Sequence, residues 1–298
     1  MEKLCLKCLQ PLLSSEVWYG LHANCFTDWF NLKALDAFQN IVSHRHSGGS
    51  PIKDGFKSSF FHGKFRKYSS SLGGTRYILK VQENGFPELP ATEYVCNQIF
   101  SHLKINVPSF HLIAWEENHV CFVTRNFMED YPESSLVHLW HFFEKSMRYD
   151  CENLLKIIGE KTGRLAAQEE IVYLVLADSL IGNNDRHGRN LGLIQTSKGY
   201  ILPPFYDNPS NLGIENDWFL NADLQPAGAI WTKNVTKPTM ADYIEECSRL
   251  GFAHVVDRFR ENISMPTLER LVKESMLTPK RQSALLRLID RRHRELWG

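Results

Sequence analysis

The segment IGNNDRHGRNLGLI, residues 181–194, contains polar side chains whose spacing suits chemistry on phosphate groups. Asp185 is followed after four residues by Asn190, and Asp207 comes after a short β-rich stretch. Magnesium at phosphoryl-transfer sites is bound by oxygen ligands, typically an Asp carboxylate and an Asn side-chain oxygen. A further carboxylate accepts or orients the proton of the attacking hydroxyl group. The pattern therefore predicts Asp185 as a catalytic base and Asn190 and Asp207 as magnesium ligands.

A lysine on an upstream strand, Lys80 in TRYILKV, is in the place expected for a group that binds the α- and β-phosphates of ATP. Such a lysine needs a carboxylate on the following helix. Glu93 in ELPATEYVCNQIF is placed for that role, and Glu88 is the nearby alternative. Each residue also has an ordinary interpretation, since aspartates form turns and lysines and glutamates usually lie at the surface. The order and spacing of the whole set favour a nucleotide site.

Several predicted elements must position these side chains. Alternation and β-forming residues predict strands at 64–69, 75–81 and 120–127, with a turn at 70–74. Short strands are expected at 191–194 and 200–202, on either side of a turn. Helical spacing of apolar residues predicts helices at 29–41, 91–103, 135–147, 150–166 and 168–181, and several more between 239 and 296.

A strand-rich first part followed by a helical second part predicts an α+β fold. We expect a two-lobed, protein-kinase-like arrangement with a small β-rich N-lobe, residues 1–130, and a larger helical C-lobe, residues 131–298. The junction is expected near 124–132. Ligands often bind in clefts between lobes, so the nucleotide site is predicted there.

Composition limits the other classes of function. The formal net charge is zero, so the chain lacks the basic field that drives non-specific binding to nucleic acid. No stretch approaches the roughly 18 apolar residues of a membrane span, and no signal peptide is evident, so we expect a cytoplasmic protein that uses no membrane. Seven cysteines in 298 residues do not indicate a disulfide framework.

Four segments resemble the signature segments of the HipA-type toxin kinases, in their shorter HipT-like form: GGTRYILKV, ELPATEYVCNQIF, IGNNDRHGRNLGLI and PPFYDNPS. The resemblance extends over roughly residues 1–295. The DRHxxN element that begins at Asp185 and ends at Asn190 is also similar to the catalytic loop of the phosphatidylinositol 3/4-kinases, whose fold is related.

The resemblance implies an ATP- and magnesium-dependent serine/threonine kinase that is the toxin of a toxin–antitoxin system. Known members phosphorylate aminoacyl-tRNA synthetases, so a translation-related protein is the implied substrate. It also implies antitoxin partners: a small protein equivalent to the N-terminal subdomain of larger HipA-type proteins, and a DNA-binding protein. The substrate, the antitoxin and the oligomeric state cannot be read from the sequence.

The family carries a phosphate loop of the form S-x-S-G-x-Q-x-K before its first hairpin. The matching stretch is taken as residues 57–64, with Ser58, Ser59, Gly63 and Lys64 as candidates for contact with the phosphates of ATP. Backbone N–H groups in such a loop would surround the phosphates, because glycine allows a close approach. The resemblance implies autophosphorylation of Ser58 or Ser59, and the added charge would move the loop out of the ATP site.

This stretch departs from the family pattern, because Phe60 stands where a glycine is expected. The alternative is that residues 69–74, SSSLGG, form the phosphate loop, but their place directly before the Lys80 strand favours a hairpin turn.

The adenine ring is expected at the strand between the lobes, near Thr124 and Phe127. His187 is a further candidate for ATP binding. Arg186 and His187 can be interpreted either as residues that orient Asp185 or as structural residues of the cleft, and the sequence does not separate the two.

The N-terminus contains two pairs with the spacing of metal ligands. Cys5 and Cys8 form the first pair, and His22 and Cys25 the second, 13 residues later. Three thiolates and one imidazole would suit a tetrahedral, closed structural zinc site. The alternative is that the cysteines are free thiols packed among apolar side chains.

Two other functions remain open. A phosphatidylinositol-type lipid kinase would share DRHxxN, but the segment after Asp207, NPSNLGIENDWFLNADLQPAG, has no Lys or Arg and three acidic residues. That segment is poorly suited to an anionic lipid surface, so a protein substrate is favoured. A pseudokinase that acts as a binding module is the other alternative, and the presence of every key polar group weighs against it.

Overall fold

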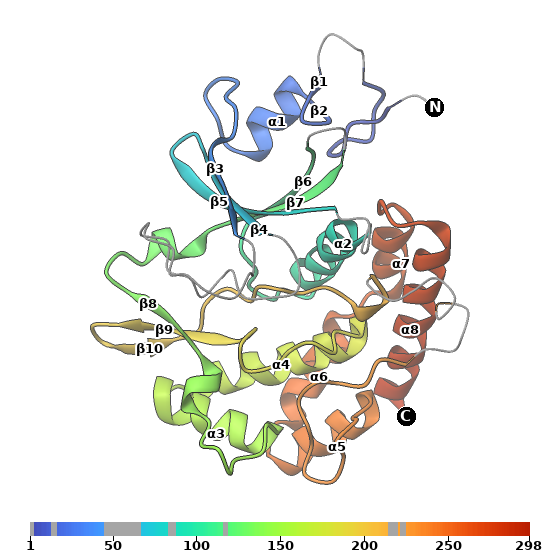
Figure 1. Cartoon of the computed structure of the whole chain (residues 1–298). Helices are drawn as coiled ribbons and strands as arrows, with labels where there is room; N and C mark the ends of the chain where they lie inside the picture. The colour runs from blue at the N-terminus through green and yellow to red at the C-terminus, as the bar shows by residue number, and fades with distance from the viewer. Residues whose placement is uncertain are drawn as a thin grey trace.

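The computed structural model describes residues 3–12, 17–44, 67–82, 88–115, 119–213, 220 and 225–298. Strands dominate the part before residue 126 and helices dominate the part after residue 150 (Figure 1). The predicted α+β class is therefore confirmed. The division into lobes at residue 130 stays a prediction.

A five-stranded sheet forms the centre of the first part, in the strand order β3-β4-β5-β7-β6 with antiparallel neighbours. Its strands are β3 (Gln39–His44), β4 (Lys67–Leu72), β5 (Thr75–Val81), β6 (Phe110–Ala114) and β7 (Val120–Arg125). β4 and β5 form a hairpin whose two turn residues, Gly73 and Gly74, have φ of +57° and +81°. Glycine adopts these values without steric cost, which fixes the register of the two strands.

One face of this sheet is covered by the N-terminal elements, which are β1 (Val17–Trp18), β2 (Leu21–His22) and α1 (Ala23–Trp29). Helix α2 (Leu89–His102) packs against β6 and β7 and also lies beside the C-terminal helices (Figure 1). Because α2 contacts both the sheet and the helical part, it can couple the two.

The second part is mainly helical. Its helices are α3 (Cys151–Thr162), α4 (Leu165–Ile181), α5 (Met240–Arg249), α6 (Ala253–Asn262), α7 (Met265–Lys273) and α8 (Pro279–Trp297). A three-stranded antiparallel sheet joins it, made of β8 (Ser135–His138), β9 (Gly192–Thr196) and β10 (Gly199–Ile201). Short 3-10 helices are η3 (Phe127–Asp130), η4 (Leu139–Phe142) and η5 (Asn211–Gly213). No helix in the described ranges is both long and apolar enough to cross a membrane.

Two helix predictions are wrong. The helix expected at 29–41 is absent from that described stretch, because α1 ends at Trp29 and β3 begins at Gln39 and pairs with β4. The helix expected at 135–147 is replaced by β8 and η4, since 135–138 pair with β9. In both cases hydrogen bonding to a distant strand outweighs the local apolar spacing.

Candidate active site

β4 and β5 direct two lysines toward the same side of the sheet. Lys67 and Lys80 are register partners in this antiparallel pair, so their side chains share one face. Only 4% of Lys67 and 6% of Lys80 is exposed. Their neighbours Tyr68 and Leu79 point to the opposite face and pack in the apolar cluster beneath α1. The alternation of the two strands therefore brings two buried ammonium groups together.

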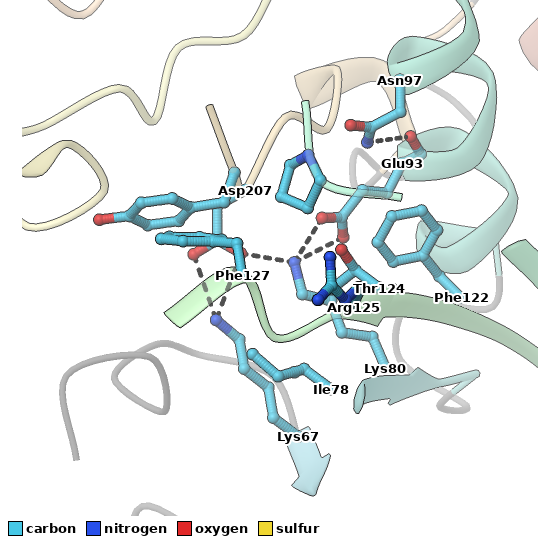
Figure 2. A pocket seen from close by; sticks show the side chains of 12 residues that line it. Lys67, Ile78, Lys80, Glu93, Asn97, Phe122, Thr124, Arg125, Phe127 and Asp207 are labelled. Carbon is cyan, nitrogen blue, oxygen red and sulfur yellow. Dashed lines mark hydrogen bonds and ion pairs between the residues drawn. The ribbon is translucent and has the colours of Figure 1, made fainter. Parts of the chain in front are cut away.

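Two carboxylates pair with these lysines (Figure 2). Lys80 Nζ lies 2.5 and 2.7 Å from the carboxylate oxygens of Glu93 on α2, and 2.5 Å from Asp207 Oδ1. Lys67 Nζ lies 3.3 and 3.2 Å from the two carboxylate oxygens of Asp207. The four groups form a continuous chain of alternating charge.

The pKa values follow from this arrangement. Burial opposes ionisation of Asp207, but the ammonium groups of Lys67 and Lys80 outweigh burial and hold its pKa below the ordinary value. Burial lowers the pKa of Lys80, whereas the carboxylates of Asp207 and Glu93 more than offset it and raise that pKa. For Lys67, burial dominates and its pKa is lowered. Lys80 is thus a permanent cation at neutral pH, and Asp207 a permanent anion.

A hollow of about 410 Å³, partly open to solvent, lies over this ionic chain. Its other walls come from β5, β7, η3 and the Tyr206 segment, and include Ile78, Phe122, Thr124, Arg125, Phe127 and Tyr206. Aromatic and aliphatic side chains next to paired cations offer an apolar surface for a ring system and charges for phosphate groups.

Asp207 is held in an uncommon backbone conformation, with φ of +54°. An aspartate tolerates this left-handed region better than most residues, but it still requires support from its surroundings. The next residue, Asn208, is fully buried and donates from Nδ2 to Asn97 Oδ1 at 3.0 Å and to the Phe205 carbonyl oxygen at 2.9 Å. The segment that carries Asp207 is thereby fastened to α2.

Arg186 connects this segment to the loop of Asp185. It is 1% exposed and donates to both carboxylate oxygens of Asp178 on α4, at 2.8 and 3.0 Å. Its Nη1 donates to the carbonyl oxygens of Asn190 and Tyr206, at 3.2 and 2.7 Å, and Nη2 to Asn208 Oδ1 at 2.6 Å. Because Nη1 of Arg186 bonds to both carbonyl oxygens, the backbone at Asn190 lies beside the backbone at Tyr206. Arg186 is therefore a positioning residue, buried away from solvent.

Asp185 and Asn190 form a pair at the mouth of this loop. Asn190 Nδ2 donates to the Asp185 backbone carbonyl at 2.9 Å and to Asp185 Oδ2 at 3.0 Å. This fixes the amide so that Oδ1, the atom a metal ion would bind, is turned away from Asp185. The Asp185 side chain is 63% exposed, as expected of a group that must meet a second substrate, and His187 Nε2 lies 3.5 Å from its Oδ1.

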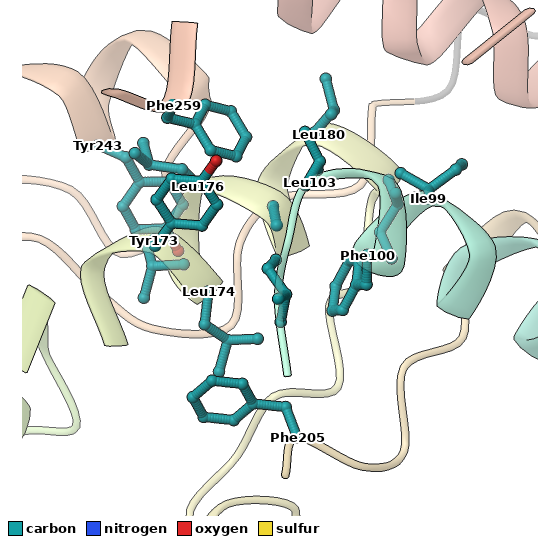
Figure 3. Close-up of a cluster of buried hydrophobic side chains, with 14 of the residues drawn as sticks. Ile99, Phe100, Leu103, Tyr173, Leu174, Leu176, Leu180, Phe205, Tyr243 and Phe259 are labelled. Atoms are coloured by element: carbon teal, nitrogen blue, oxygen red, sulfur yellow. The ribbon is translucent and has the colours of Figure 1, made fainter. Parts of the chain in front are cut away.

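The loop is anchored by α4, in which 12 of the 17 residues are buried. Its apolar side chains surround the helix, and Leu174, Leu176 and Leu180 pack in one cluster with Ile99, Phe100 and Leu103 from α2 and its end (Figure 3). Helices with apolar residues all round belong to protein cores. α4 ends at Gly182, whose φ of +71° stops the helix and releases the chain into the Asp185 loop.

Comparison with known proteins agrees with this geometry. Residues 54–278 match the family model of the HipA-like C-terminal domain, which is well over half of the chain. The chain belongs to the HipA-like C-terminal domain family. The match includes the Lys80 strand, α2, the Asp185 loop and Asp207.

Three individual proteins are similar to this HipA-like chain. A Haemophilus influenzae protein named "Putative kinase" is 29% identical over 150 residues, which is 44% of each protein, so the chain matches less than half the length of that relative. The crystal structure of the Helicobacter pylori proinflammatory kinase CtkA has a TM-score of 0.64 at 19% identity, over 77% of this chain and 90% of that one. HipA of Shewanella oneidensis MR-1, solved with HipB and operator DNA, has a TM-score of 0.53 at 15% identity, over 76% of this chain and 59% of that one. The predicted two-lobed, kinase-like fold is confirmed by these similarities.

The predicted site residues of this HipA-like chain fall into three groups. Lys80, Glu93, Thr124, Phe127 and Asp207 all line the same pocket. Asp185, Asn190 and His187 form a second group outside that lining, which Arg186 connects to the Asp207 segment. Ser58, Ser59, Gly63 and Lys64 lie outside the described residues.

The alternative partner of Lys80, Glu88, lies elsewhere. Its carboxylate accepts hydrogen bonds from Arg281 Nε and the Thr278 backbone N–H, both at 2.7 Å, and so ties the start of α2 to the start of α8. Glu93 is the glutamate that contacts Lys80.

Lys67 is the member of the ionic chain that the sequence reasoning missed. The family pattern S-x-S-G-x-Q-x-K ends on a lysine, and a signal for Lys67 was present in it. Moving the match by three residues, from 57–64 to 60–67, puts Gly63 at the glycine position and Lys67 at the final lysine. With this shift Phe60 no longer stands at the glycine position. Instead, Phe60 and His62 stand at the two positions where the family has serines.

The chemistry of two side chains would suit a magnesium ion: Asp207 would supply carboxylate oxygens and Asn190 an amide oxygen, which are the hard ligands that magnesium prefers. In this structure both carboxylate oxygens of Asp207 are bound by lysines. Bound by them, the ion would neutralise negative charge on the phosphates.

The N-terminal cysteine and histidine pairs also come together. The ligand atoms of Cys5, Cys8, His22 and Cys25 all lie within 4.8 Å of one another. This site is separate from the pocket, because α1 and its neighbours cover the other face of the sheet.

Proposed function

We propose that this chain is an ATP- and magnesium-dependent protein kinase that phosphorylates serine or threonine. The observation that carries the proposal is the ionic chain Lys67–Asp207–Lys80–Glu93 beneath an apolar pocket, next to the Asp185–Asn190 loop. Buried lysines are uncommon, and charged groups with perturbed pKa values that line a pocket favour a functional site. Membership of the HipA-like family and the similarity to kinases support the same reaction.

The proposed reaction is direct transfer of the γ-phosphoryl group. The bond from the γ-phosphorus to the bridging oxygen of ADP breaks, and a bond forms to the substrate hydroxyl oxygen, whose proton passes to Asp185. Lys80 and Lys67 bind the phosphates of ATP and neutralise charge on the departing ADP. Asp207 and Asn190 hold magnesium. Positioning and electrostatics supply the rate enhancement, and no covalent enzyme intermediate is needed.

ATP suits the charges of this pocket. In the structure Lys67 and Lys80 both bind Asp207. When Asp207 binds a metal ion instead, the phosphate oxygens of ATP would replace it as the partners of the two ammonium groups. The adenine ring would lie against Ile78 and Phe127, near Thr124 at the end of β7. His187 is proposed as a contact to the nucleotide or to Asp185.

We further propose that this kinase is the toxin of a toxin–antitoxin system and that its substrate is a translation-related protein such as an aminoacyl-tRNA synthetase. HipA of Shewanella oneidensis forms a complex with HipB and operator DNA, which supports a DNA-binding antitoxin partner here. A small protein equivalent to the N-terminal subdomain of larger HipA-type proteins is the second proposed partner. Autophosphorylation of Ser58 or Ser59 is proposed as the regulatory step.

Phosphoproteomics tests the proposal. A bacterial lysate is incubated with ATP, magnesium and either the wild-type chain or the Asp185→Asn variant. We expect phosphoserine or phosphothreonine peptides from a translation-related protein, and one from residues 58–64 of the chain itself, only with the wild type. Identical peptide sets in the two reactions would refute kinase activity.

Phosphorylated lipid in place of peptide would identify a lipid kinase. Phosphate on the substrate but not on residues 58–64 would favour the alignment that ends at Lys67.

A further inference from the structure

Residues 3–12 and 17–29 build a small module that the kinase proposal does not use. A tight turn carries Cys5 and Cys8 and is closed by hydrogen bonds from Cys5 N to the Gln10 carbonyl and from Leu9 N to the Cys5 carbonyl, both 2.9 Å. The β1–β2 hairpin follows, with His22 at its end, and α1 carries Cys25 in its first turn. These three pieces bring the two pairs of side chains to one point.

The distances within the cluster are those of a metal site. His22 Nδ1 lies 3.4 Å from Cys8 Sγ and 3.9 Å from Cys25 Sγ. A tetrahedral ion with bonds of about 2.3 Å to sulfur and about 2.0–2.1 Å to nitrogen would separate these atoms by about 3.6 Å. All four ligand atoms lie within 4.8 Å of one another. One ion at their centre would therefore reach every ligand after only small adjustments.

The histidine is held in the tautomer that a metal requires. Its Nε2 lies 3.0 Å from the Pro11 backbone carbonyl oxygen. A carbonyl oxygen only accepts, so Nε2 carries the hydrogen, and in the neutral imidazole Nδ1 is then the unprotonated nitrogen. Nδ1 is the nitrogen that faces the thiols. A backbone carbonyl bonded to the second ring nitrogen is the usual support of a metal-bound histidine.

We propose that Cys5, Cys8, His22 and Cys25 bind one zinc ion. Three soft thiolates and one imidazole in a compact tetrahedral arrangement select zinc over the hard cations. Four protein ligands fill the coordination sphere, so the ion is structural and has no open position for a substrate. Free thiols would leave Nδ1 of His22 with only weak S–H donors, whereas zinc satisfies all four groups at once.

A metal ion would add to the apolar contacts that hold this small module on the sheet. β1 and β2 have two residues each and α1 has seven. Modules of this size are usually stabilised by disulfides or metal ions, and all seven cysteines of the chain are free thiols.

Zinc would fix the aromatic side chains that cover the sheet. Phe26 follows Cys25 directly, and its ring stacks on Tyr19 with centroids 5.4 Å apart. Phe30 meets Tyr77 of β5 at 5.5 Å, edge to face. Tyr77 is on the same strand as Lys80 but on the opposite face. The ion therefore supports the back of the sheet whose front carries the lysines.

Metal analysis of the full chain, purified under reducing conditions without a polyhistidine tag, tests this inference. We expect one zinc per chain by elemental analysis. Replacement by cobalt should give the visible absorption of tetrahedral cobalt bound to thiolates. Cys8→Ser and His22→Ala should retain at least tenfold less zinc after dialysis against a chelator, and should melt roughly 5–10 °C lower. These readouts do not depend on kinase activity.

Cys121→Ala is the matched control. Cys121 is fully buried in the same apolar cluster as Cys5 but lies outside the proposed ligand set, so the variant should keep its zinc. If a ligand variant fails to fold, titration of the wild type with a mercurial thiol reagent replaces it, and zinc should be released as the thiols react. Wild-type protein without zinc, a disulfide among the three cysteines, or full zinc retention by the ligand variants would overturn the inference.

Discussion

At the scale of single residues, Asp207 has two roles to reconcile. Its carboxylate is the shared partner of Lys67 and Lys80, both almost fully buried, and it is also the proposed magnesium ligand. Removing one member of a buried charge network leaves its partners unpaired, which is far more costly than removing a surface charge. Activity lost in an Asp207 variant can therefore arise from unfolding as well as from lost chemistry.

We predict that Asp207→Ala lowers the free energy of unfolding by about 3–5 kcal/mol, because two buried ammonium groups lose their common carboxylate. Asp207→Asn should cost less, because its amide oxygen still accepts a hydrogen bond. Urea denaturation measures both. Asp290→Ala, which breaks the exposed i,i+4 pair with Arg294, is the control and should cost under about 1 kcal/mol. Equal stability of Asp207→Ala and the control would contradict the charge network.

The stabilising effect of Asp207 should depend on pH in a defined direction. Its folded pKa lies below the ordinary value because Lys67 and Lys80 outweigh burial. The folded state therefore binds fewer protons than the unfolded state, whose Asp pKa is about 3.9, and the stabilisation is fully present above that pH. We predict that the stability difference between wild type and Asp207→Asn is constant from about pH 5 to 8 and shrinks below about pH 4. A difference that shrinks between pH 8 and 6 would show that another group is responsible.

Some residues of the candidate site could be predicted from the sequence, and others could not. The contact between Lys80 and Glu93 could be predicted because the order of the two residues along the chain matches that in kinases. Asp185 and Asn190 stay predicted site residues on the strength of their local spacing. Strand alternation alone did not reveal Lys67, because its burial depends on the register of β4 against β5 and on Asp207, 140 residues away. Only the family pattern, aligned so that it ends at Lys67, marks this residue in the sequence.

At the scale of elements, α2 is fastened at its start and near its middle. Glu88 at its start binds Arg281 and Thr278, and Asn97 near its middle accepts a hydrogen bond from Asn208. Glu93 lies between these two anchors and contacts Lys80. The helix therefore sets the distance between the Lys80 strand and the Asp207 segment.

We predict that Asn97→Ala lowers the free energy of unfolding by about 1–2 kcal/mol and kcat/KM for phosphoryl transfer by about tenfold. Asn208 loses one acceptor of its buried amide, and Glu93 and Asp207 are no longer held together around Lys80. Steady-state kinetics and urea denaturation measure the two effects.

Asn262→Ala is a closely matched control. Like Asn97, Asn262 donates from Nδ2 to the carbonyl oxygen four residues earlier at 2.8 Å, but it lies on the exposed surface of α6. Its kinetics should equal those of the wild type. A loss of activity as large in Asn262→Ala as in Asn97→Ala would show that helix stability alone is responsible.

Helices could be predicted where the apolar spacing is regular over a long continuous stretch of the chain. The helix expected at 168–181 is α4, and the helices expected after 239 are α5 to α8. The errors at 29–41 and 135–147 share a physical cause. Gln39–His44 and Ser135–His138 become strands because distant partners, β4 and β9, satisfy their backbone groups. Apolar spacing within a short window carries no information about such partners.

At the scale of the whole molecule, the described contacts that link the sheet to the helical part include those of α2 and the ion pairs of Lys67 and Lys80 with Asp207. The overall class could be predicted because strands and helices are segregated along the chain. The closeness of Asp207 to two strand lysines could not, since it follows from how the parts pack. The pocket thus exists only in the assembled molecule.

Calorimetric titration with a non-hydrolysable ATP analogue tests the central claim, that the ionic chain over Asp207 binds a magnesium–nucleotide complex. The account predicts that the wild type binds the analogue more tightly with magnesium than with a chelator. Asp207→Asn should bind the analogue with the same affinity in both conditions. Lys80→Met and Lys67→Met should bind it at least tenfold more weakly than the wild type. Binding by the wild type that ignores magnesium, or equal affinity in the lysine variants, would contradict it.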